Sequence, residues 1–256
     1  MGLSSFSLEG KVATVTGGRR GIGRAIALAL AEAGADVAVC DLVAGDELEA
    51  VADEIKGLGR RSLAIRTDTT RKSDVDNLAQ RVMDELGGID ILVNNAAINI
   101  LLPLLDTSED DWDKVINVNL KGYYLCSQAI GKKMVDRKRG SIINMASRLA
   151  FQANPGIWQS AYCIAKAGVV MLTRVLSREL ASYNIRVNAI APGLVKTEMS
   201  HDIWGAPGTL EKLEASVPLG RLAVPDDMTG AALFLASGAS SYITGHTILV
   251  DGGTYA

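Results

Sequence analysis

Residues 12–23 read Val12-Ala13-Thr14-Val15-Thr16-Gly17-Gly18-Arg19-Arg20-Gly21-Ile22-Gly23. The first five residues are typical of a buried β-strand, and the glycines after them are typical of a tight loop. An Ala- and Leu-rich segment, Arg24–Ala33, then predicts a helix. This order of strand, glycine loop and helix is the one that a dinucleotide-binding site requires.

Each glycine of the loop has a predicted task in such a site. Gly17 makes the tight turn, and Gly21 lets the backbone approach a pyrophosphate. Gly23 lets the helix lie close to the strand, while the N–H groups at the helix start, around Ile22, bind the anion. Loops collect glycine for other reasons too, but the position at the first strand–helix connection favours the nucleotide interpretation.

Asp41 ends the second predicted strand, where a dinucleotide site carries the acidic residue that binds the adenosine ribose. Its carboxylate would accept hydrogen bonds from the ribose hydroxyls, each contributing about 1.5–3 kcal/mol, and would repel the 2′-phosphate of NADP. Arg20 acts in the opposite direction, because its guanidinium could reach such a phosphate. We expect Asp41 to dominate and the cofactor to be NAD rather than NADP. The alternative for Asp41 is a turn or capping residue.

Short β-branched runs alternate with amphipathic helical patterns along the whole chain. The predicted strands are Val12–Thr16, Val37–Asp41, Ser62–Arg66, Ile89–Val93, Ser141–Met145, Arg186–Ile190 and Thr247–Val250. Most are nearly continuous apolar runs, typical of parallel strands with helices on both faces. The sequence therefore predicts an α/β fold, a Rossmann-type doubly wound sheet of about seven parallel strands, in a single catalytic domain over residues 1–256.

The composition is that of an ordinary globular protein. The chain has 256 residues, with 26 Lys+Arg against 29 Asp+Glu and a formal charge of −3, so nothing in it attracts nucleic acid or anionic lipid. Three separated cysteines argue against a disulfide framework or a thiolate zinc site, and two histidines argue against a multi-histidine metal centre, while a carboxylate-rich metal site stays open. The N-terminus, MGLSSFSLEGK, lacks the pattern of a secretion signal, and no apolar run reaches the length of a membrane span. We expect a soluble, cytoplasmic protein.

The predicted helix from about Tyr162 to Leu180 is apolar on most sides. A helix that faces only the sheet needs one apolar face, so the other face is expected to meet a second subunit. The chain is therefore predicted to form a homo-oligomer, a dimer or a homotetramer. The alternative is that long neighbouring loops cover this face.

Tyr162 and Lys166 are four residues apart on this helix and therefore share one face. Hydride transfer to or from a carbonyl carbon needs a matched proton transfer at the oxygen, which NAD cannot supply. A phenol can supply it if its pKa falls from about 10 towards 7, a change of about 4 kcal/mol. A lysine charge about 4–5 Å away supplies about 3–4 kcal/mol at an effective dielectric constant of about 20. We therefore expect Lys166 to lower the pKa of Tyr162.

Together these motifs resemble those of the short-chain dehydrogenases/reductases, in the compact single-domain branch of that family. The matching residues are Thr16-Gly17-Gly18-Arg19-Arg20-Gly21-Ile22-Gly23, Asn94-Asn95-Ala96-Ala97, Ser147, Tyr162-xxx-Lys166, Pro192-Gly193 and Leu249-Val250-Asp251-Gly252-Gly253. The resemblance covers almost the whole chain. It departs from the family pattern at Ala97, where glycine is more usual, so that the backbone there must avoid positive φ.

The resemblance implies roles for individual residues. Tyr162 would be the general acid/base, with Lys166 binding the nicotinamide ribose and Ser147 stabilising the substrate oxygen. Asn119 would anchor a proton-relay water. The remaining implied cofactor contacts are Asp68 and Thr69 at the adenine, Asn94 and Asn95 in a cofactor-facing loop, and Pro192, Gly193, Val195 and Thr197, the last at the carboxamide. Purely structural roles remain open for three of these residues: Ser147 could be a turn residue, Asn119 could hydrogen-bond backbone groups, and Thr197 could cap a helix.

The substrate is the least determined property. The loop Arg148–Ala161 and a glycine- and proline-containing segment around residues 194–219 are predicted to line the entrance, the second as a lid. Trp158 and Trp204 could stack on a sugar, clasp an apolar ring or simply pack the loops. The leading hypothesis is an NAD-dependent oxidoreductase that acts on the CH–OH group of a polyol, sugar or cyclic alcohol. The alternatives are an NADPH-dependent 3-oxoacyl-thioester reductase and a non-catalytic nucleotide-binding regulator.

Overall fold

The protein forms one parallel sheet. The computed structural model describes residues 3–153 and 158–255, and within these ranges a seven-stranded sheet has the order β3-β2-β1-β4-β5-β6-β7. The strands are β1 (Val12–Thr16), β2 (Asp36–Asp41), β3 (Ser62–Arg66), β4 (Ile91–Asn94), β5 (Gly140–Met145), β6 (Ile185–Pro192) and β7 (Thr247–Val250). The predicted Rossmann-type sheet is confirmed, with β1, β3 and β7 at their expected bounds. The strand order reverses between β1 and β4, and such a reversal opens a crevice beyond the carboxyl ends of the strands.

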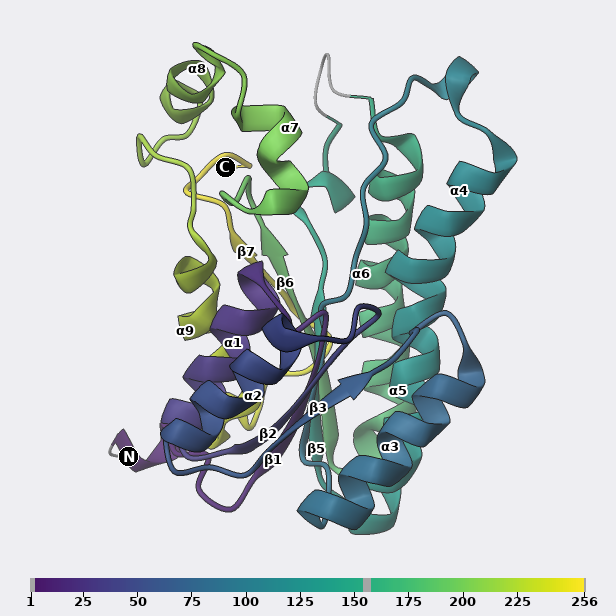
Figure 1. Ribbon diagram of the computed structural model, residues 1–256, viewed down its shortest axis with the longest axis vertical. Coiled ribbons are helices and arrows are strands. Elements are labelled where there is room, and N and C mark those ends of the chain that lie inside the picture. The colour runs from purple at the N-terminus through teal and green to yellow at the C-terminus, as the bar shows by residue number, and fades with distance from the viewer. Residues whose placement is uncertain (1–2, 154–157, 256) are drawn as a thin grey trace.

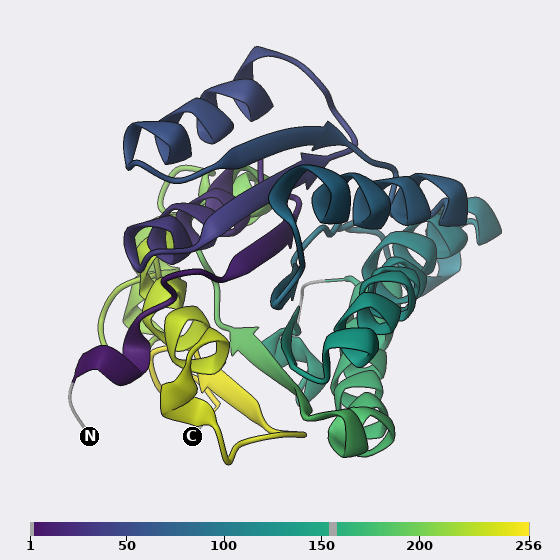
Figure 2. The same ribbon diagram turned by 90° about the horizontal axis from the view of Figure 1, so that it is seen from below.

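Helices cover both faces of the sheet (Figure 1). One face carries α1 (Gly21–Glu32), α2 (Asp46–Gly57) and α9 (Thr229–Ala236). The other carries α3 (Lys72–Leu86), α5 (Gly122–Arg137) and α6 (Ser160–Leu180), and the view along the layers separates the two sets (Figure 2). α4 (Glu109–Ile116) runs into α5 through a π turn, η3 (Asn117–Lys121). α7 (His201–Trp204) and α8 (Thr209–Ala215) lie above the carboxyl ends of the strands, at the top of Figure 1.

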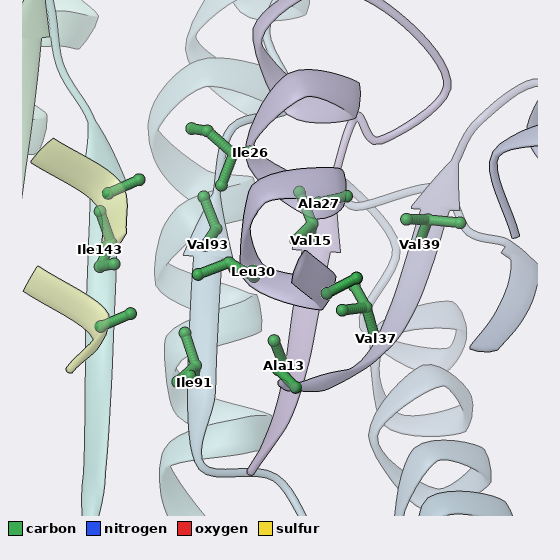
Figure 3. Close-up of a cluster of buried hydrophobic side chains, with 14 of the residues drawn as sticks. Ala13, Val15, Ile26, Ala27, Leu30, Val37, Val39, Ile91, Val93 and Ile143 are labelled. Carbon is green, nitrogen blue, oxygen red and sulfur yellow. The ribbon is translucent and has the colours of Figure 1, made fainter. Parts of the chain in front are cut away.

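The core between α1 and the sheet holds the first strand–helix unit in place. All five residues of β1 are buried, as expected for a strand with helices on both faces. Leu30 and Ile26 point from α1 into the layer formed by β1, β2 and β4, and neither side chain is exposed (Figure 3). Because α1 starts at the glycine loop, this packing also fixes the loop on the sheet.

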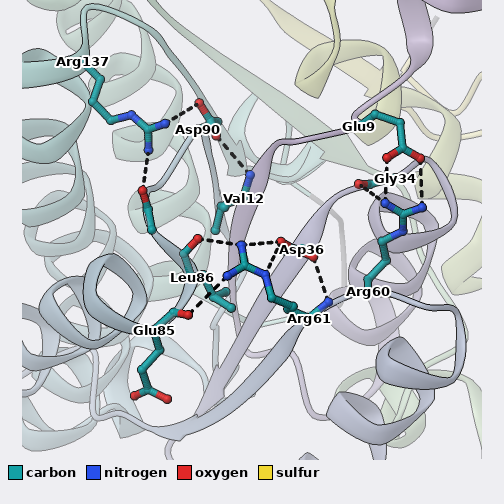
Figure 4. Close-up of polar contacts among 11 residues, drawn as sticks. Glu9, Val12, Gly34, Asp36, Arg60, Arg61, Glu85, Leu86, Asp90 and Arg137 are labelled. Carbon is teal, nitrogen blue, oxygen red and sulfur yellow. Dashed lines mark hydrogen bonds and ion pairs between the residues drawn. The ribbon is translucent and has the colours of Figure 1, made fainter.

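Polar side chains hold the amino ends of the strands (Figure 4). Asp90, just before β4, accepts a hydrogen bond from Val12 N at 3.1 Å, and its other carboxylate oxygen lies 2.7 Å from Arg139 Nε. Asp36 at the start of β2 accepts from Arg61 N at 2.8 Å, and Arg61 Nη2 donates to Leu86 O at 2.8 Å. These contacts lie at the end of the sheet opposite the crevice, so they stabilise the fold and leave the crevice free.

α6 is a long helix with many apolar residues. The stretch Ser160–Tyr183 is, by length and composition, able to cross a membrane, but 39% of its most apolar window is buried inside the protein. Its buried residues, Val169 and Val170 among them, pack beside β6 as in the core helix of an α/β fold. Ile164, Met171 and Val175 remain 52%, 55% and 43% exposed.

Truncating Leu30 to alanine is expected to lower the free energy of unfolding by about 2–5 kcal/mol, because it leaves a cavity between α1 and β1. Leu105→Ala is the matched control, since Leu105 is 95% exposed and its loss should change stability by less than about 0.5 kcal/mol. Urea unfolding of both variants measures the difference. Equal stabilities for the two variants would show that the α1 core is not what holds the first strand–helix unit.

Candidate active site

The glycine loop packs tightly against the start of α1. Gly17 has a φ of +64°, and a Cβ on it would lie 2.8 Å from Ala96 Cα. A Cβ on Gly23 would lie 2.1 Å from Gly17 O, so only glycine lets the helix approach its strand this closely. Gly21 has a φ of +55°, and the Thr197 side chain, at 3.5 Å, is the one described neighbour that an added Cβ would meet. The tight turn at Gly17 and the close approach at Gly23 are present, and the binding of a pyrophosphate at Gly21 stays a prediction.

The loop and the N-terminus of α1 fit an anionic group. Arg20 occupies the N-cap position in an extended conformation, and no described side chain caps the first turn. Backbone N–H groups of that turn therefore point at the crevice with the positive end of the helix dipole behind them. The first turn also contains no acidic residue. A dinucleotide pyrophosphate fits this loop on both grounds.

Two adjoining cavities lie above the carboxyl ends of the strands. The glycine-loop cavity, of about 340 Å³, is lined by residues that include Gly17, Gly21, Asp41, Asp68 and Thr69. The tyrosine cavity, of about 150 Å³, is lined by residues that include Ser147, Tyr162, Lys166, Pro192 and Gly193. Five residues line both cavities, namely Ile22, Asn95, Ala97, Thr197 and Met199. The two cavities thus form one cleft that runs from the end of β2 to α6.

Opposite charges meet at the β2 end of this cleft. Asp41 accepts from Val43 N at 3.1 Å, and its Oδ1 lies 3.7 Å from Arg19 Nε. Both side chains are mostly buried, at 17% and 15% exposed, and Arg19 also pairs with Glu47. Arg20, the predicted contact of a 2′-phosphate, lines the glycine-loop cavity and forms an exposed ion pair with Glu198. The basic residue beside Asp41 is therefore Arg19, whose role the sequence analysis missed.

Tyr162, Lys166 and Ser147 come together in the tyrosine cavity. Tyr162 and Lys166 project from α6, and the Lys166 Nζ lies 5.6 Å from the Tyr162 ring centroid. Ser147 follows β5 as the N-cap of η4 (Arg148–Ala150), where its Oγ accepts from Leu149 N at 3.2 Å. Parallel strands and their following helices deliver their ends to the same edge, which is why residues so distant in sequence meet here.

Lys166 is held by groups that sequence reasoning did not identify. Its Nζ donates to Met145 O at 2.7 Å and to Tyr123 Oη at 3.2 Å. Tyr123 Oη in turn donates to Met145 O at 3.3 Å, and the Lys166 Nζ lies 4.9 Å from the Tyr123 ring centroid. Lys166 is 2% exposed and Tyr123 is 1% exposed. The amine is therefore fixed between β5 and α5, one turn from Tyr162.

Burial dominates the proton affinities of this cluster. It raises the pKa of Tyr162 to about 12, and the hydrogen bond with Ser147 acts in the opposite direction. It lowers the pKa of Lys166 to about 7. The expected lowering of the Tyr162 pKa by Lys166 is wrong for the protein alone, because desolvation penalises the phenolate and also the ammonium that was to stabilise it.

Asn119 lies in the π turn η3 and is fully buried. Its Oδ1 accepts from Ile98 N at 2.9 Å, and its Nδ2 donates to Ile98 O at 2.8 Å. Asn119 therefore fixes the segment after β4, which forms one wall of the cleft, and its side chain lies behind that wall. This geometry corresponds to the backbone-satisfying role that the sequence left open; the water relay remains a prediction.

The two asparagines after β4 face different ways. Asn95 lines the cleft, and its Nδ2 donates to Thr16 O and Gly17 O, both at 3.0 Å. Asn94 is fully buried and does not face the cleft, because its Nδ2 donates to Ser127 Oγ at 3.0 Å and Asn144 Oδ1 at 2.8 Å. The expected cofactor-facing pair is thus one cleft residue and one core residue. Ala97 has no positive φ, as expected.

The segment after β6 closes the cleft from above. Val195 and Thr197 line the tyrosine cavity, and Thr197 also caps η6 (Glu198–Ser200), whereas its contact with the carboxamide stays a prediction. Met199, Ile203 and Leu213 of the predicted lid segment line the same cavity. Trp204 turns away, since its Nε1 donates to Ser200 Oγ at 3.0 Å and its ring stacks edge-on against His201. Trp158 is 59% exposed, and residues 154–157 of the other entrance loop lie outside the described residues.

The chain matches the family model described as enoyl-(acyl carrier protein) reductase over residues 17–255. It is 42% identical over 252 residues to a 2-dehydro-3-deoxy-D-gluconate 5-dehydrogenase of Escherichia coli, covering 98% of each protein. It is 41% identical over 245 residues to a 3-oxoacyl-(acyl-carrier-protein) reductase of Staphylococcus epidermidis, covering 96% of this chain and 99% of the relative. A D-threitol dehydrogenase of Mycolicibacterium smegmatis is 42% identical over 248 residues, with 97% and 94% covered.

Solved structures agree with these relatives. A short-chain type dehydrogenase/reductase from Mycobacterium marinum superposes with a TM-score of 0.94 at 42% identity, covering 98% of both chains. A gluconate 5-dehydrogenase from Burkholderia cenocepacia, in complex with NADP and tartrate, superposes with a TM-score of 0.92 at 35% identity, covering 98% of this chain and 97% of that one. With the glycine loop, the Tyr162–Lys166 pair and Ser147 assembled on a doubly wound sheet, the chain belongs to the short-chain dehydrogenase/reductase family.

Proposed function

We propose that this oxidoreductase interconverts a secondary alcohol, such as a polyol, a sugar or a cyclic alcohol, and its ketone with NAD as cofactor. The observation that carries the proposal is the assembly of Ser147, Tyr162 and Lys166 in one cavity that adjoins the glycine-loop cavity. Relatives named for a deoxygluconate and for D-threitol support an alcohol with several hydroxyls. A panel of alcohols and ketones tried with each cofactor, and followed by the absorbance of reduced nicotinamide, tests it.

In this proposal Tyr162 moves the proton. A nicotinamide dinucleotide held by Gly21, Asp41 and Asn95 would supply the hydride acceptor and, in its oxidised form, a positive charge in the cleft. Tyr162 Oη takes the proton of the alcohol as general base and returns it to the ketone oxygen in the reverse direction. Ser147 Oγ donates to the substrate oxygen, where negative charge develops. Because burial keeps Tyr162 protonated in the protein alone, positive charge in the cleft is what makes its ionisation accessible.

The NAD preference rests on Asp41, whose carboxylate lies in the wall of the glycine-loop cavity. It offers acceptors to two ribose hydroxyls and repels a 2′-phosphate. Two observations favour NADP as the cofactor instead, namely the position of Arg19 beside Asp41 and the NADP in the structure of the relative from Burkholderia cenocepacia. We favour NAD because Arg19 is already paired with two carboxylates, those of Asp41 and Glu47.

The second candidate function is reduction of a 3-oxoacyl thioester with NADPH. The relative from Staphylococcus epidermidis and Arg19 favour it. A purely nucleotide-binding regulator is disfavoured, because such a protein needs no proton donor beside the nicotinamide. Residues 1–256 are proposed to act as one catalytic domain, with residues 194–219 as its lid, since Met199 and Leu213 of that segment line the tyrosine cavity.

Tyr162→Phe is expected to abolish turnover, a loss of at least about 10³-fold, because it removes the general acid/base and leaves the ring in place. Binding of the dinucleotide, measured by calorimetry, should change little. The matched control is Tyr124→Phe, since Tyr124 is 46% exposed on α5 and lies outside both cavities. Activity retained by Tyr162→Phe would refute the assignment of Tyr162.

Asp41→Ala is expected to weaken the binding of NAD by about tenfold or more and to strengthen the binding of NADP, because it removes ribose acceptors and a negative charge. The KM values of both dinucleotides measure the change. Asp36→Ala is a suitable control, since Asp36 lies at the opposite end of the same strand. Unchanged cofactor kinetics in Asp41→Ala would remove Asp41 from the ribose site.

We also propose that a second copy of the chain covers the exposed apolar face of α6, defined by Ile164, Met171 and Val175. Light scattering is expected to give two or four times the chain mass of 27.0 kDa. Val175→Glu should lower that mass by placing a charge in the interface, and Leu105→Glu, on an exposed turn elsewhere, should not. A mass of one chain for the unaltered protein would contradict the proposal.

A further inference from the structure

A pair of side-chain amides forms part of the wall of the tyrosine cavity. Asn99 lies on the segment after β4, and Gln159 lies at the start of α6, three residues before Tyr162. Both line the cavity together with Ser147 and Tyr162. Gln159 is 5% exposed, so its amide lies inside the cleft wall and not on the outer surface.

One hydrogen bond sets the orientation of this pair. Asn99 Nδ2 donates to Gln159 Oε1 at 2.9 Å. The Oε1 end of the Gln159 amide therefore faces Asn99, and the Nε2 end, with two N–H donors, faces away from it. Within the described residues, Gln159 makes its side-chain hydrogen bond through Oε1, and the buried Asn99 Oδ1 has no partner.

The two groups differ in their access to the cavity. The Asn99 Oδ1 is closed off, whereas the Gln159 amide belongs to the cavity wall. Buried amide groups are normally hydrogen-bonded, so a donor left free at the wall of a cavity points to a ligand oxygen that completes it. In a polyol or sugar the carbon next to the reacting carbon carries such an oxygen, as a hydroxyl, whereas in a 3-oxoacyl thioester neither neighbouring carbon carries one.

We propose that Gln159 is a specificity-determining residue, whose Nε2 donates to a substrate hydroxyl on the carbon next to the reacting carbon, and that Asn99 is the positioning residue that orients its amide. The inference rests on the proposed dehydrogenase function and narrows its substrate to the class of vicinal diols and α-hydroxyketones. Because Gln159 is the N-cap residue of α6 and Tyr162 lies on the first turn of that helix, a hydroxyl bound by Gln159 belongs to a carbon close to the one whose oxygen Tyr162 protonates.

The test compares two alcohols that differ by one hydroxyl, butane-2,3-diol and butan-2-ol. With the unaltered protein, kcat/KM for the diol is expected to exceed that for the mono-alcohol by at least about tenfold, the effect of one well-placed hydrogen bond. Gln159→Met keeps the length of the side chain and removes the amide. It should bring the ratio close to one by lowering the value for the diol, while butan-2-ol is oxidised as before.

Two further variants separate positioning from direct contact. Asn99→Leu removes the group that orients Gln159 and is expected to lower the ratio partly. Gln80→Met is the matched control, since Gln80 lies on the exposed side of α3, where it binds Asp84, and its loss should leave the ratio unchanged. If Gln159→Met does not fold, Gln159→Glu replaces the donating group by an acceptor of the same shape and should lose the preference as well.

The outcomes distinguish the inference from the proposed function. A diol preference that survives in Gln159→Met or Gln159→Glu overturns the inference and leaves the proposed function standing. The proposed function fails if the unaltered protein oxidises no alcohol of the wider panel with either cofactor. If neither butane-2,3-diol nor butan-2-ol is oxidised, the inference is tested by calorimetry. The binding of 3-hydroxybutan-2-one is compared with the binding of butan-2-one in the presence of reduced dinucleotide. Tighter binding of the hydroxyketone that disappears in Gln159→Met supports the inference, and equal binding overturns it.

Discussion

The architecture of the cleft depends on the junction between the ends of β1 and β4. Thr16 Oγ1 accepts from Asn95 N at 2.9 Å and from Ala96 N at 3.1 Å, while Asn95 Nδ2 donates back to Thr16 O and Gly17 O. These bonds close the point at which the strand order reverses. They hold the glycine loop against the segment after β4, so that Asn95 lies at the boundary between the glycine-loop cavity and the tyrosine cavity and lines both. Any backbone shift here would move both cavities together.

Desolvation governs the chemistry of this cleft more than pairwise attraction does. A buried phenol and a buried amine, one helical turn apart, each resist taking up charge. The buried amine of Lys166 is stable without a neighbouring anion, because Met145 O and Tyr123 Oη accept its hydrogen bonds. A cluster of this kind responds strongly to a charge brought in from outside. A cationic nicotinamide ring in the cleft would therefore lower the pKa of Tyr162 far more than the same charge would at a solvated site.

Much of the fold and the main site residues could be predicted from sequence, because they depend on local pattern. Continuous apolar runs located the strands, and the spacing of glycines located the loop. The residues missed depend on contacts between distant segments: Arg19 beside Asp41, Tyr123 against Lys166, and Asn99 against Gln159. The orientation of Asn94 could not be read either, since strand residues alternate between faces and only the packed sheet decides which polar side chain finds partners inside. The pKa of Tyr162 could not be predicted for the same reason, because the burial of a side chain depends on the complete fold.

The π turn at Asn117–Lys121 has a geometric consequence for the long rod formed by α4 and α5. A π turn accommodates an extra residue in one turn, and each residue of an α-helix rotates the chain by about 100°. The two halves of the rod are thus out of phase. Asn119 accepts a hydrogen bond from the backbone after β4, while Tyr123, on the following turn, accepts a hydrogen bond from Lys166 on α6. Loss of a single amino acid from the turn would swing the whole second half around its own axis, so chain length at this point is as constrained as chemistry is.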